Sequence, residues 1–322
     1  MNTFCDCINE YIEYCEYRKR LDSKTLKAYK IDLKQFKNFA SDYCDITIKN
    51  VIDKFITTLH KKYKPKTVKR KIASIKAYFH YLEYLDYIDE NPFSKLDTHF
   101  REEKLLPKII PFHSIQIFLS TLYEQKQYTT TEYQQRCCIR DIAVMELLFA
   151  TGMRISELCS IIPENIDLQN NSVLIYGKGR KERILQIGNQ EVLDALCLYK
   201  KTYEEEIKKC GFFFVNKLCH KLSDQSVRFM INKYAKLAGI EQHITPHMFR
   251  HSFATLLLEQ DVDIRYIQQI LGHSSISTTE IYTHVSNVKQ KDILYKKHPR
   301  NLIQFNNCLL YTSDAADDSL RV

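Results

Sequence analysis

The sequence predicts a mainly α-helical protein of two domains, with a small β-sheet in the second domain. Apolar residues recur every three or four positions through residues 1–98, which is the spacing of amphipathic helices. Farther along, two short alternating segments flank turn-forming residues, as in a β-hairpin. The length of 322 residues also favours two domains over one.

Residues 1–98 form the first expected domain, which is helical throughout. One helix begins with Ser23 as its N-cap, and a later helix carries a second apolar stripe. The apolar positions of the first helix are Leu26, Tyr29, Leu33, Phe36, Ala40 and Tyr43, and those of the second are Val68, Ile72, Ile75, Phe79 and Leu82. We expect both stripes to face a common core.

The same two helices carry many cations. Lysines recur beside the first apolar stripe, and residues 61–76 hold eight Lys or Arg and no acid. One such stripe is usually a solvated face, but two without matching acids favour a surface that follows phosphates. The net charge of +8 agrees, although charge alone is a weak argument. We expect double-stranded DNA to contact Lys24, Lys27, Lys34, Lys66, Lys69 and Arg70.

The helical pattern stops at Asn91-Pro92, and residues 99–111 read as an interdomain linker. A second domain follows over residues 112–300. The sequence predicts helices over 140–149, 192–207, 226–238, 248–258 and 264–271, and strands over 172–176 and 183–187. Residues 301–322 are expected to be a disordered or artefactual tail without function. The sequence leaves open whether residues 308–322 belong to the native protein.

Eleven cysteines occur at irregular spacings, without the Cys-x-x-Cys pairs of a zinc site. No secretory leader precedes them, so we expect free thiols, mostly buried as small apolar residues, in the reducing cytoplasm. The longest apolar stretch, residues 142–150, contains Glu146 and is too short to span a bilayer, which argues against a membrane partner.

Four strings carry the chemistry. They are Ala150-Thr-Gly-Met-Arg-Ile-Ser-Glu-Leu158, Gly177-Lys-Gly-Arg-Lys-Glu-Arg183, Thr245-Pro-His-Met-Phe-Arg-His251 and Leu271-Gly-His-Ser-Ser-Ile-Ser-Thr-Thr-Glu-Ile-Tyr-Thr-His284. Arginine forks can bind phosphate oxygens, imidazoles can move protons near neutral pH, and a phenol can act as a nucleophile. Together they suit attack on a phosphodiester without a metal.

These strings resemble the tyrosine recombinases, or phage-integrase family, most closely the Xer-like members, over residues 1 to about 300. The resemblance implies an N-terminal helical core-binding (SAM-like) domain and an α+β catalytic domain. It also assigns the catalytic roles: Arg154 and Arg250 bind phosphate oxygens, His247 and His273 donate hydrogen bonds or take a proton, and Tyr282 is the nucleophile.

The hairpin turn offers several candidates for the general acid that protonates the leaving 5′-oxygen. The Gly-Lys-Gly spacing of related recombinases selects Lys178. However, three further cations crowd the same turn and could instead contact backbone phosphates, namely Arg180, Lys181 and Arg183.

Two further residues of these strings, Glu157 and His251, have supporting roles or none. Glu157, one turn after Arg154, either holds that guanidinium in place or makes a plain i, i+3 pair. His251 and His247 have the spacing of a zinc helix, but Met248 stands where such a helix would need its general base. We therefore expect His251 to pack beside the site and no metal to bind.

The resemblance implies a site-specific DNA recombinase that works through a 3′-phosphotyrosyl intermediate without metal or cofactor. It also implies a tetramer on synapsed DNA, of this chain alone or with a related recombinase, in which residues 286–297 dock on a neighbour. DNA integration, excision and resolution of chromosome or plasmid dimers all fit the motifs. Two alternatives remain: a type IB topoisomerase, and a catalytically silent DNA-binding protein of the same fold.

Overall fold

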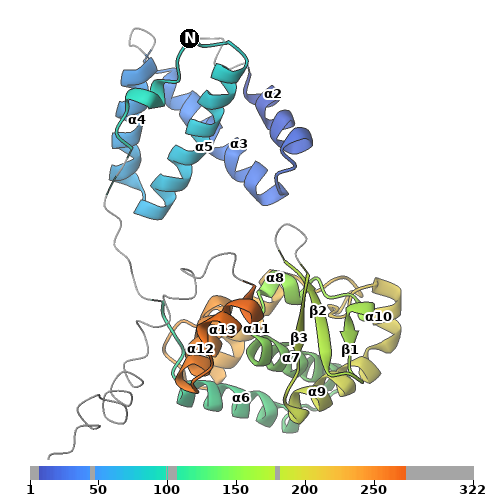
Figure 1. The fold of residues 1–322 in the computed structure, drawn as a ribbon. Coiled ribbons are helices and arrows are strands. Elements are labelled where there is room, and N and C mark those ends of the chain that lie inside the picture. Colours follow the sequence, from blue (N-terminus) through green and yellow to red (C-terminus); the bar gives the residue numbers. More distant parts are fainter. Residues whose placement is uncertain (1–6, 44–47, 99, 101–106, 178–181, 273–322) are drawn as a thin grey trace, which may run out of the picture. The chain divides into compact units, whose positions relative to one another are not determined.

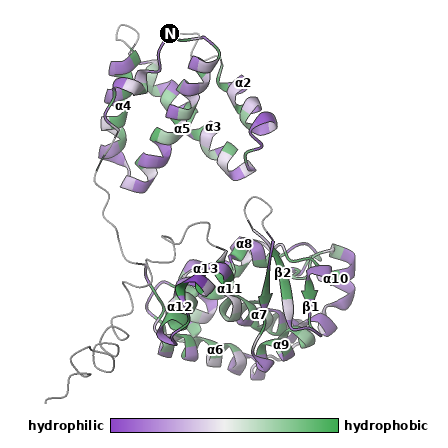
Figure 2. Cartoon of the chain, viewed as in Figure 1, coloured by the Kyte–Doolittle hydropathy of each residue, from purple (hydrophilic) through white to green (hydrophobic). Residues whose placement is uncertain are grey.

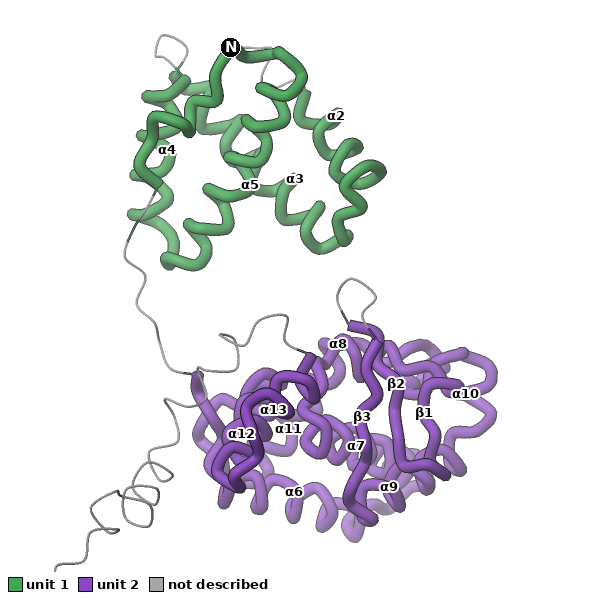
Figure 3. Tube along the Cα trace, in the orientation of Figure 1, with its two compact units in different colours: residues 1–104 green, residues 105–322 purple. Residues whose placement is uncertain are grey.

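The computed structural model describes residues 7–43, 48–98, 100, 107–177 and 182–272. The chain divides into two compact units, residues 1–104 and 105–322 (Figure 3), and each has its own hydrophobic core. The described residues are mainly helical, with one three-stranded sheet in the second unit (Figure 1). The predicted architecture, mainly α with a small sheet, is confirmed.

The first unit consists of helices packed around aromatic and aliphatic side chains. Its elements are α2 (Ile8–Glu13), a π-helical turn (Tyr14–Arg18), α3 (Ser23–Ala40), α4 (Ile48–Lys62), α5 (Pro65–Tyr84) and a 3₁₀ turn (Pro92–Lys95). All five apolar residues predicted for the stripe of α5 are buried. Each of these helices carries both hydrophobic and hydrophilic residues, as amphipathic packing requires (Figure 2).

Helix α3 starts one residue differently from the prediction. Ser23 is the first helical residue, and its predicted role as N-cap is taken by Asp22. The Asp22 carboxylate accepts the Thr25 backbone N–H at 3.0 Å and the Thr25 hydroxyl at 2.8 Å. A carboxylate caps both groups at once and also complements the helix dipole, so the acid prevails over the neighbouring serine.

A buried ionic network joins α3 to α5. Asp32, 1% exposed, accepts from Lys71 Nζ at 2.8 Å and from the Ser74 hydroxyl at 3.1 Å, and also pairs with Arg70. Lys71 donates in addition to Gln35 at 2.6 Å. Lys71 is one of the eight cations of residues 61–76, but because it is buried in this network it does not belong to a basic surface.

The second unit places helices around a small antiparallel sheet. Its elements are α6 (Phe112–Gln127), α7 (Glu132–Thr151), α8 (Ile155–Leu158), a 3₁₀ turn (Pro163–Asn165), β1 (Ile166–Asp167), β2 (Ser172–Tyr176), β3 (Glu182–Gln186), α9 (Gln190–Thr202), α10 (Glu204–Cys210), α11 (Asp224–Leu237), α12 (Pro246–Glu259) and α13 (Ile264–Leu271). The strands run in the order β1-β2-β3, and both pairings are antiparallel. The short strand β1 extends the predicted hairpin.

Helix α7 is the centre of this unit. It packs against α6, α8, α9, α11 and α12, and residues 141–148 are all buried. The helix ends at Gly152, whose φ of 58° gives the left-handed C-cap that suits glycine. A Cβ at this position would lie only 2.4 Å from Cδ1 of Phe253, so α12 approaches the end of α7 closely.

The single helix predicted over residues 192–207 is wrong, because the structure divides it into α9 and α10. Tyr203 lies between them with φ −117° and ψ 21°, outside the helical region. Its buried ring packs on Tyr199 with ring centroids 4.8 Å apart. Three glutamates in the first turn of α10 favour a new helix start, because acids stabilise the positive end of the helix dipole.

The eight cysteines in the described part of the chain are all free thiols. Cys7, Cys15, Cys138 and Cys159 are buried as expected, but Cys197 is exposed on α9, so the prediction of burial is wrong there. None of the helices in the described ranges is long and apolar enough to cross a membrane.

Candidate active site

Helix α12 presents three of the predicted residues. Thr245 caps it by accepting the Met248 N–H at 3.4 Å, and Pro246 occupies the first turn, where its missing N–H costs nothing. The cap sets where the helix starts. Consequently His247 lies in the first turn, and Arg250 and His251 follow one turn later.

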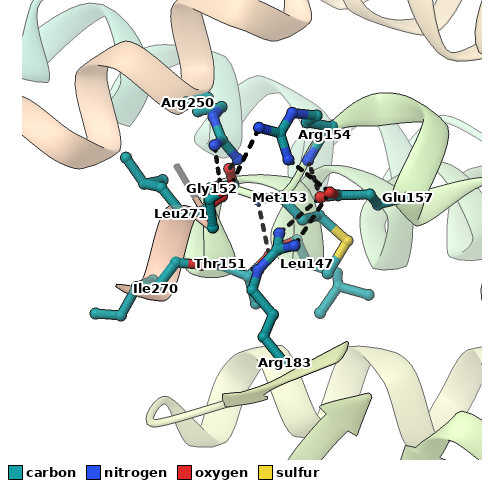
Figure 4. Close-up of polar contacts among 11 residues, drawn as sticks. Leu147, Thr151, Gly152, Met153, Arg154, Glu157, Arg183, Arg250, Ile270 and Leu271 are labelled. Atoms are coloured by element: carbon teal, nitrogen blue, oxygen red, sulfur yellow. Dashed lines mark hydrogen bonds and ion pairs between the residues drawn. The ribbon is translucent and has the colours of Figure 1, made fainter. Parts of the chain in front are cut away.

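Arg250 is a buried arginine, 4% exposed, that joins two helix ends. Its Nη1 donates to the Gly152 carbonyl at 2.8 Å, and its Nη2 donates to the Leu271 carbonyl at 2.6 Å (Figure 4). The carbonyls at the C-termini of α7 and α13 have no partners within their helices and carry partial negative charge. They therefore hold this guanidinium in one place.

Arg154 lies beside Arg250, at the residue that precedes α8 (Figure 4). Its Nη1 donates to Glu157 Oε1 at 2.8 Å, and its backbone N–H donates to Oε2 at 2.8 Å. Its Nη2 lies 3.5 Å from the Gly272 carbonyl. The Arg154 side chain is 35% exposed, so the structure brings Arg154, Glu157 and Arg250 together while part of Arg154 still faces solvent.

Arg183, which comes from strand β3, was predicted only as a possible phosphate contact, and its place in this site was missed. Its guanidinium makes a bidentate pair with Glu157, with Nη2 to Oε2 at 2.7 Å and Nη1 to Oε1 at 3.1 Å. Its Nε donates to the Ile270 carbonyl at 3.0 Å. Strand alternation could have revealed this, since Arg183 and the buried Leu185 lie on the same face of β3.

Glu157 stays ionised at the centre of these contacts. Burial works to raise the pKa of its carboxyl, but hydrogen bonds from the Arg183 side chain and from the Arg154 backbone and side chain, together with the Arg183 charge, outweigh it. The pKa of Glu157 is therefore lowered. One carboxylate thus fixes two arginines.

Two histidines of α12 line a pocket of about 370 Å³ on the same unit. Desolvation by the surrounding protein lowers the pKa of His247 from 6.5, although the residue itself is exposed, and the guanidiniums of Arg250, Arg228 and Arg154 lower it further. Burial also lowers the pKa of His251, to about 4. Both imidazoles are therefore neutral at pH 7 and can accept a proton or donate one N–H.

Several predicted residues lie outside the described part of the chain: Lys178, Arg180, Lys181, His273 and Tyr282. The last described residue, Gly272, directly precedes His273 in the sequence. The Gly272 carbonyl oxygen lies 3.5 Å from Nη2 of Arg154. The predicted DNA contacts Lys24, Lys27, Lys34, Lys66, Lys69 and Arg70 all belong to the first unit and are exposed. Within the described ranges, no three His, Cys, Asp or Glu side chains are placed to hold a metal ion.

Family models match both units. Residues 120–289 match the phage integrase family, and residues 8–84 match the phage integrase N-terminal SAM-like domain. The chain is 57% identical to a tyrosine recombinase of Agathobacter rectalis, across 95% of this chain and 100% of the relative. It is 33% identical to the tyrosine recombinase XerD of Listeria monocytogenes, across 92% of this chain and 99% of the relative.

The fold is also found among solved structures. The XerH site-specific recombinase, bound to a palindromic difH substrate after cleavage, matches with a TM-score of 0.73 and 19% identity. The match covers 91% of this chain and 84% of that protein. The predicted combination of a SAM-like helical domain with an integrase catalytic domain is therefore confirmed.

Proposed function

We propose a catalytic role for three residues on the premise that the chain belongs to the phage integrase family and is a tyrosine recombinase, an enzyme that cuts and rejoins DNA at specific sites. In this proposal Tyr282 is the nucleophile, and Arg154 and Arg250 bind the attacked phosphate. The observation that carries this proposal is the convergence of both guanidiniums on the carbonyls of Leu271 and Gly272, directly before His273.

The two arginines have complementary tasks at the phosphate. Arg250 is buried and fixed by main-chain carbonyls, so it contributes a positive charge that needs no reorganisation during the reaction. Arg154 keeps a partly exposed guanidinium, held by Glu157, that can donate to two phosphate oxygens. Together they neutralise charge that builds on the non-bridging oxygens.

The protons follow from the ordinary acidities of the groups. A tyrosine hydroxyl with a pKa of about 10 needs a base at neutral pH. His247, neutral because its pKa is lowered, supplies one candidate base, and His273 the other. Lys178 protonates the leaving 5′-oxygen. The attack yields a 3′-phosphotyrosyl link and a free 5′-hydroxyl, and a partner strand's 5′-hydroxyl reverses the step without metal or cofactor.

We further propose that the first unit binds duplex DNA through its exposed lysines and that the working assembly is a tetramer. Exchange between two duplexes needs two cuts in each, hence four nucleophiles. The palindromic substrate named for the XerH structure supports two protomers on one site. Such an enzyme acts where the DNA lies, in the cytoplasm.

The decisive experiment replaces Tyr282 by Phe and uses a nicked DNA that traps the covalent adduct. Tyr282→Phe should give no adduct on a denaturing gel and should bind the same DNA with unchanged affinity. Tyr266→Phe is the matched control, because Tyr266 is a tyrosine 63% exposed on α13, and it should give adducts like the wild type. Adducts formed by Tyr282→Phe would refute the assignment.

The named relatives are tyrosine recombinases, which favours recombination over the topoisomerase alternative. A supercoiled plasmid with two cognate sites separates these activities. A recombinase yields deletion or inversion products, whereas a topoisomerase yields only relaxed plasmid of unchanged sequence.

A further inference from the structure

We propose that Arg183 is a positioning residue for strand cleavage, which acts through Glu157 to hold Arg154 in place at the phosphate. The inference rests on the proposed function, because it takes Arg154 as a ligand of the attacked phosphate. It differs from the expectation that cations of the hairpin contact DNA backbone phosphates themselves.

The contacts of Arg183 point inward. Three of its N–H groups are used within the protein, two by Glu157 and one by the Ile270 carbonyl. Its side chain is only 12% exposed. A guanidinium whose donors are directed at a buried carboxylate and a helix end is poorly placed to bind a phosphate on the surface.

Glu157 transmits the effect of Arg183 to Arg154. Its two carboxylate oxygens accept four hydrogen bonds at 2.7–3.1 Å, two from Arg183 and two from Arg154. The carboxylate is 5% exposed, so little water is available to replace a lost partner. If Arg183 changes, the carboxylate turns toward the remaining partners and the Arg154 guanidinium moves with it.

Arg183 also supports the turn at the end of α13. The Ile270 carbonyl that it binds adjoins the Leu271 carbonyl bound by Arg250. Gly272 follows with φ +65°, and a Cβ there would lie 3.0 Å from Arg183 Nη1 and 3.2 Å from its Cδ. Arg183 therefore packs directly against the backbone that leads to His273 (Figure 4).

Only an arginine can make this set of contacts. A planar guanidinium reaches both oxygens of Glu157 with its two terminal nitrogens while Nε faces Ile270. A lysine ammonium would keep the positive charge but lose the paired geometry. Arg183→Lys therefore tests orientation with the charge held constant.

The experiment measures single-turnover cleavage of nicked DNA and DNA affinity for the full chain. Arg183→Lys should slow cleavage by about 100-fold, the scale expected when a catalytic group shifts by about 1 Å. DNA affinity should stay unchanged, because Arg183 does not contact the phosphate. Arg136→Lys is the matched control, since Arg136 pairs with Glu206 far from these contacts, and it should cleave at the wild-type rate.

A double-mutant cycle separates positioning from a general loss of stability. Arg183→Lys and Glu157→Gln should be strongly non-additive in the cleavage rate, because both act through one carboxylate. Arg183→Lys and Arg136→Lys should be additive. Wild-type cleavage by Arg183→Lys, additive effects with Glu157→Gln, or a loss of DNA affinity that accounts for the slower cleavage would overturn the inference. Failure of the proposed function looks different, since Tyr282→Phe would then still form adducts.

Discussion

Arg250 donates to the carbonyl of Gly152 at 2.8 Å, although 98 residues separate them in the sequence. With its second contact to Leu271 at 2.6 Å, this one side chain holds the end of α7 beside the end of α13. A residue expected to stabilise a transition state is thus also part of the packing of the second unit.

Arg250→Ala should lower single-turnover cleavage by about two to three orders of magnitude, the usual effect of losing one transition-state donor. It should also destabilise the second unit by about 1–3 kcal/mol for each carbonyl left unsatisfied. Cleavage should therefore be measured at a temperature where thermal unfolding shows the variant folded. Arg265→Ala, at an exposed position of α13, is the control and should change neither quantity; cleavage retained by Arg250→Ala would contradict the role of Arg250.

Gly152→Ala should destabilise the protein for two separable reasons. The left-handed φ of 58° costs a non-glycine residue about 1–2 kcal/mol, and the new Cβ would clash with Phe253 at 2.4 Å. Gly211→Ala is the matched control, because Gly211 has φ 73° but nothing within 4 Å. Urea unfolding should show the larger loss for Gly152→Ala, and equal losses would mean that the close approach of α12 is unimportant.

Asp32→Leu should destabilise the first unit by about 3–5 kcal/mol, because it leaves the buried Lys71 ammonium without its charge partner. Arg70→Ala should cost under about 1 kcal/mol, since that side chain is 45% exposed. The double variant Asp32→Leu/Lys71→Met should recover much of the loss, because no charge is then buried. Denaturant unfolding checks all three, and a double variant no better than Asp32→Leu would count against the buried pair.

The free energy of unfolding should fall as the pH drops from about 6.5 to about 4. His251 has a folded pKa of about 4 against an ordinary value of 6.5, so the unfolded chain binds the proton first as pH falls. Stability is therefore complete above pH 6.5 and declines below it. His251→Gln should reduce the slope of the free energy of unfolding against pH by the equivalent of up to about one bound proton, as measured by urea unfolding between pH 4 and 6.5. An unchanged pH dependence in His251→Gln would contradict this assignment.

Removing exposed lysines of α3 should reduce the salt dependence of DNA binding. Each phosphate contact contributes about −0.9 to the slope of log K against log salt concentration, so Lys24→Gln/Lys27→Gln/Lys34→Gln should flatten it by up to about 3. Lys49→Gln, at an exposed position of α4, is the control and should have the wild-type slope. An unchanged slope in the triple variant would show that α3 does not follow the DNA backbone.

Local pattern was sufficient to predict much of the fold. The apolar spacing identified the buried stripe of α5, and the alternation around Gly177 identified the strands β2 and β3. The capping of α3 by Asp22 and the break at Tyr203 were mispredicted, although both depend on nearby residues: two adjacent residues could each have capped α3, and the apolar spacing continues across Tyr203 into α10.

The contacts between distant residues could not be read from local pattern. Lys71 has the spacing of a surface cation, but its partner Asp32 lies 39 residues earlier. Arg183 resembles its basic neighbours in sequence, whereas its carboxylate partner lies 26 residues away. The motifs placed Arg154 and Arg250 in one site, but the helix ends that hold Arg250 became visible only in the fold.

Arg250 and Arg183 differ in the kind of atom that holds most of their contacts. Arg250 is bound by main-chain carbonyls, which every amino acid supplies, so the side chain at position 271 can change during descent without releasing it. Arg183 also binds one main-chain carbonyl, that of Ile270, but its paired contact depends on the side-chain carboxylate of Glu157. Among descendants of a common ancestor, residues 157 and 183 should therefore be replaced together or not at all, whereas a change of side chain at position 271 does not by itself remove the carbonyl that binds Arg250.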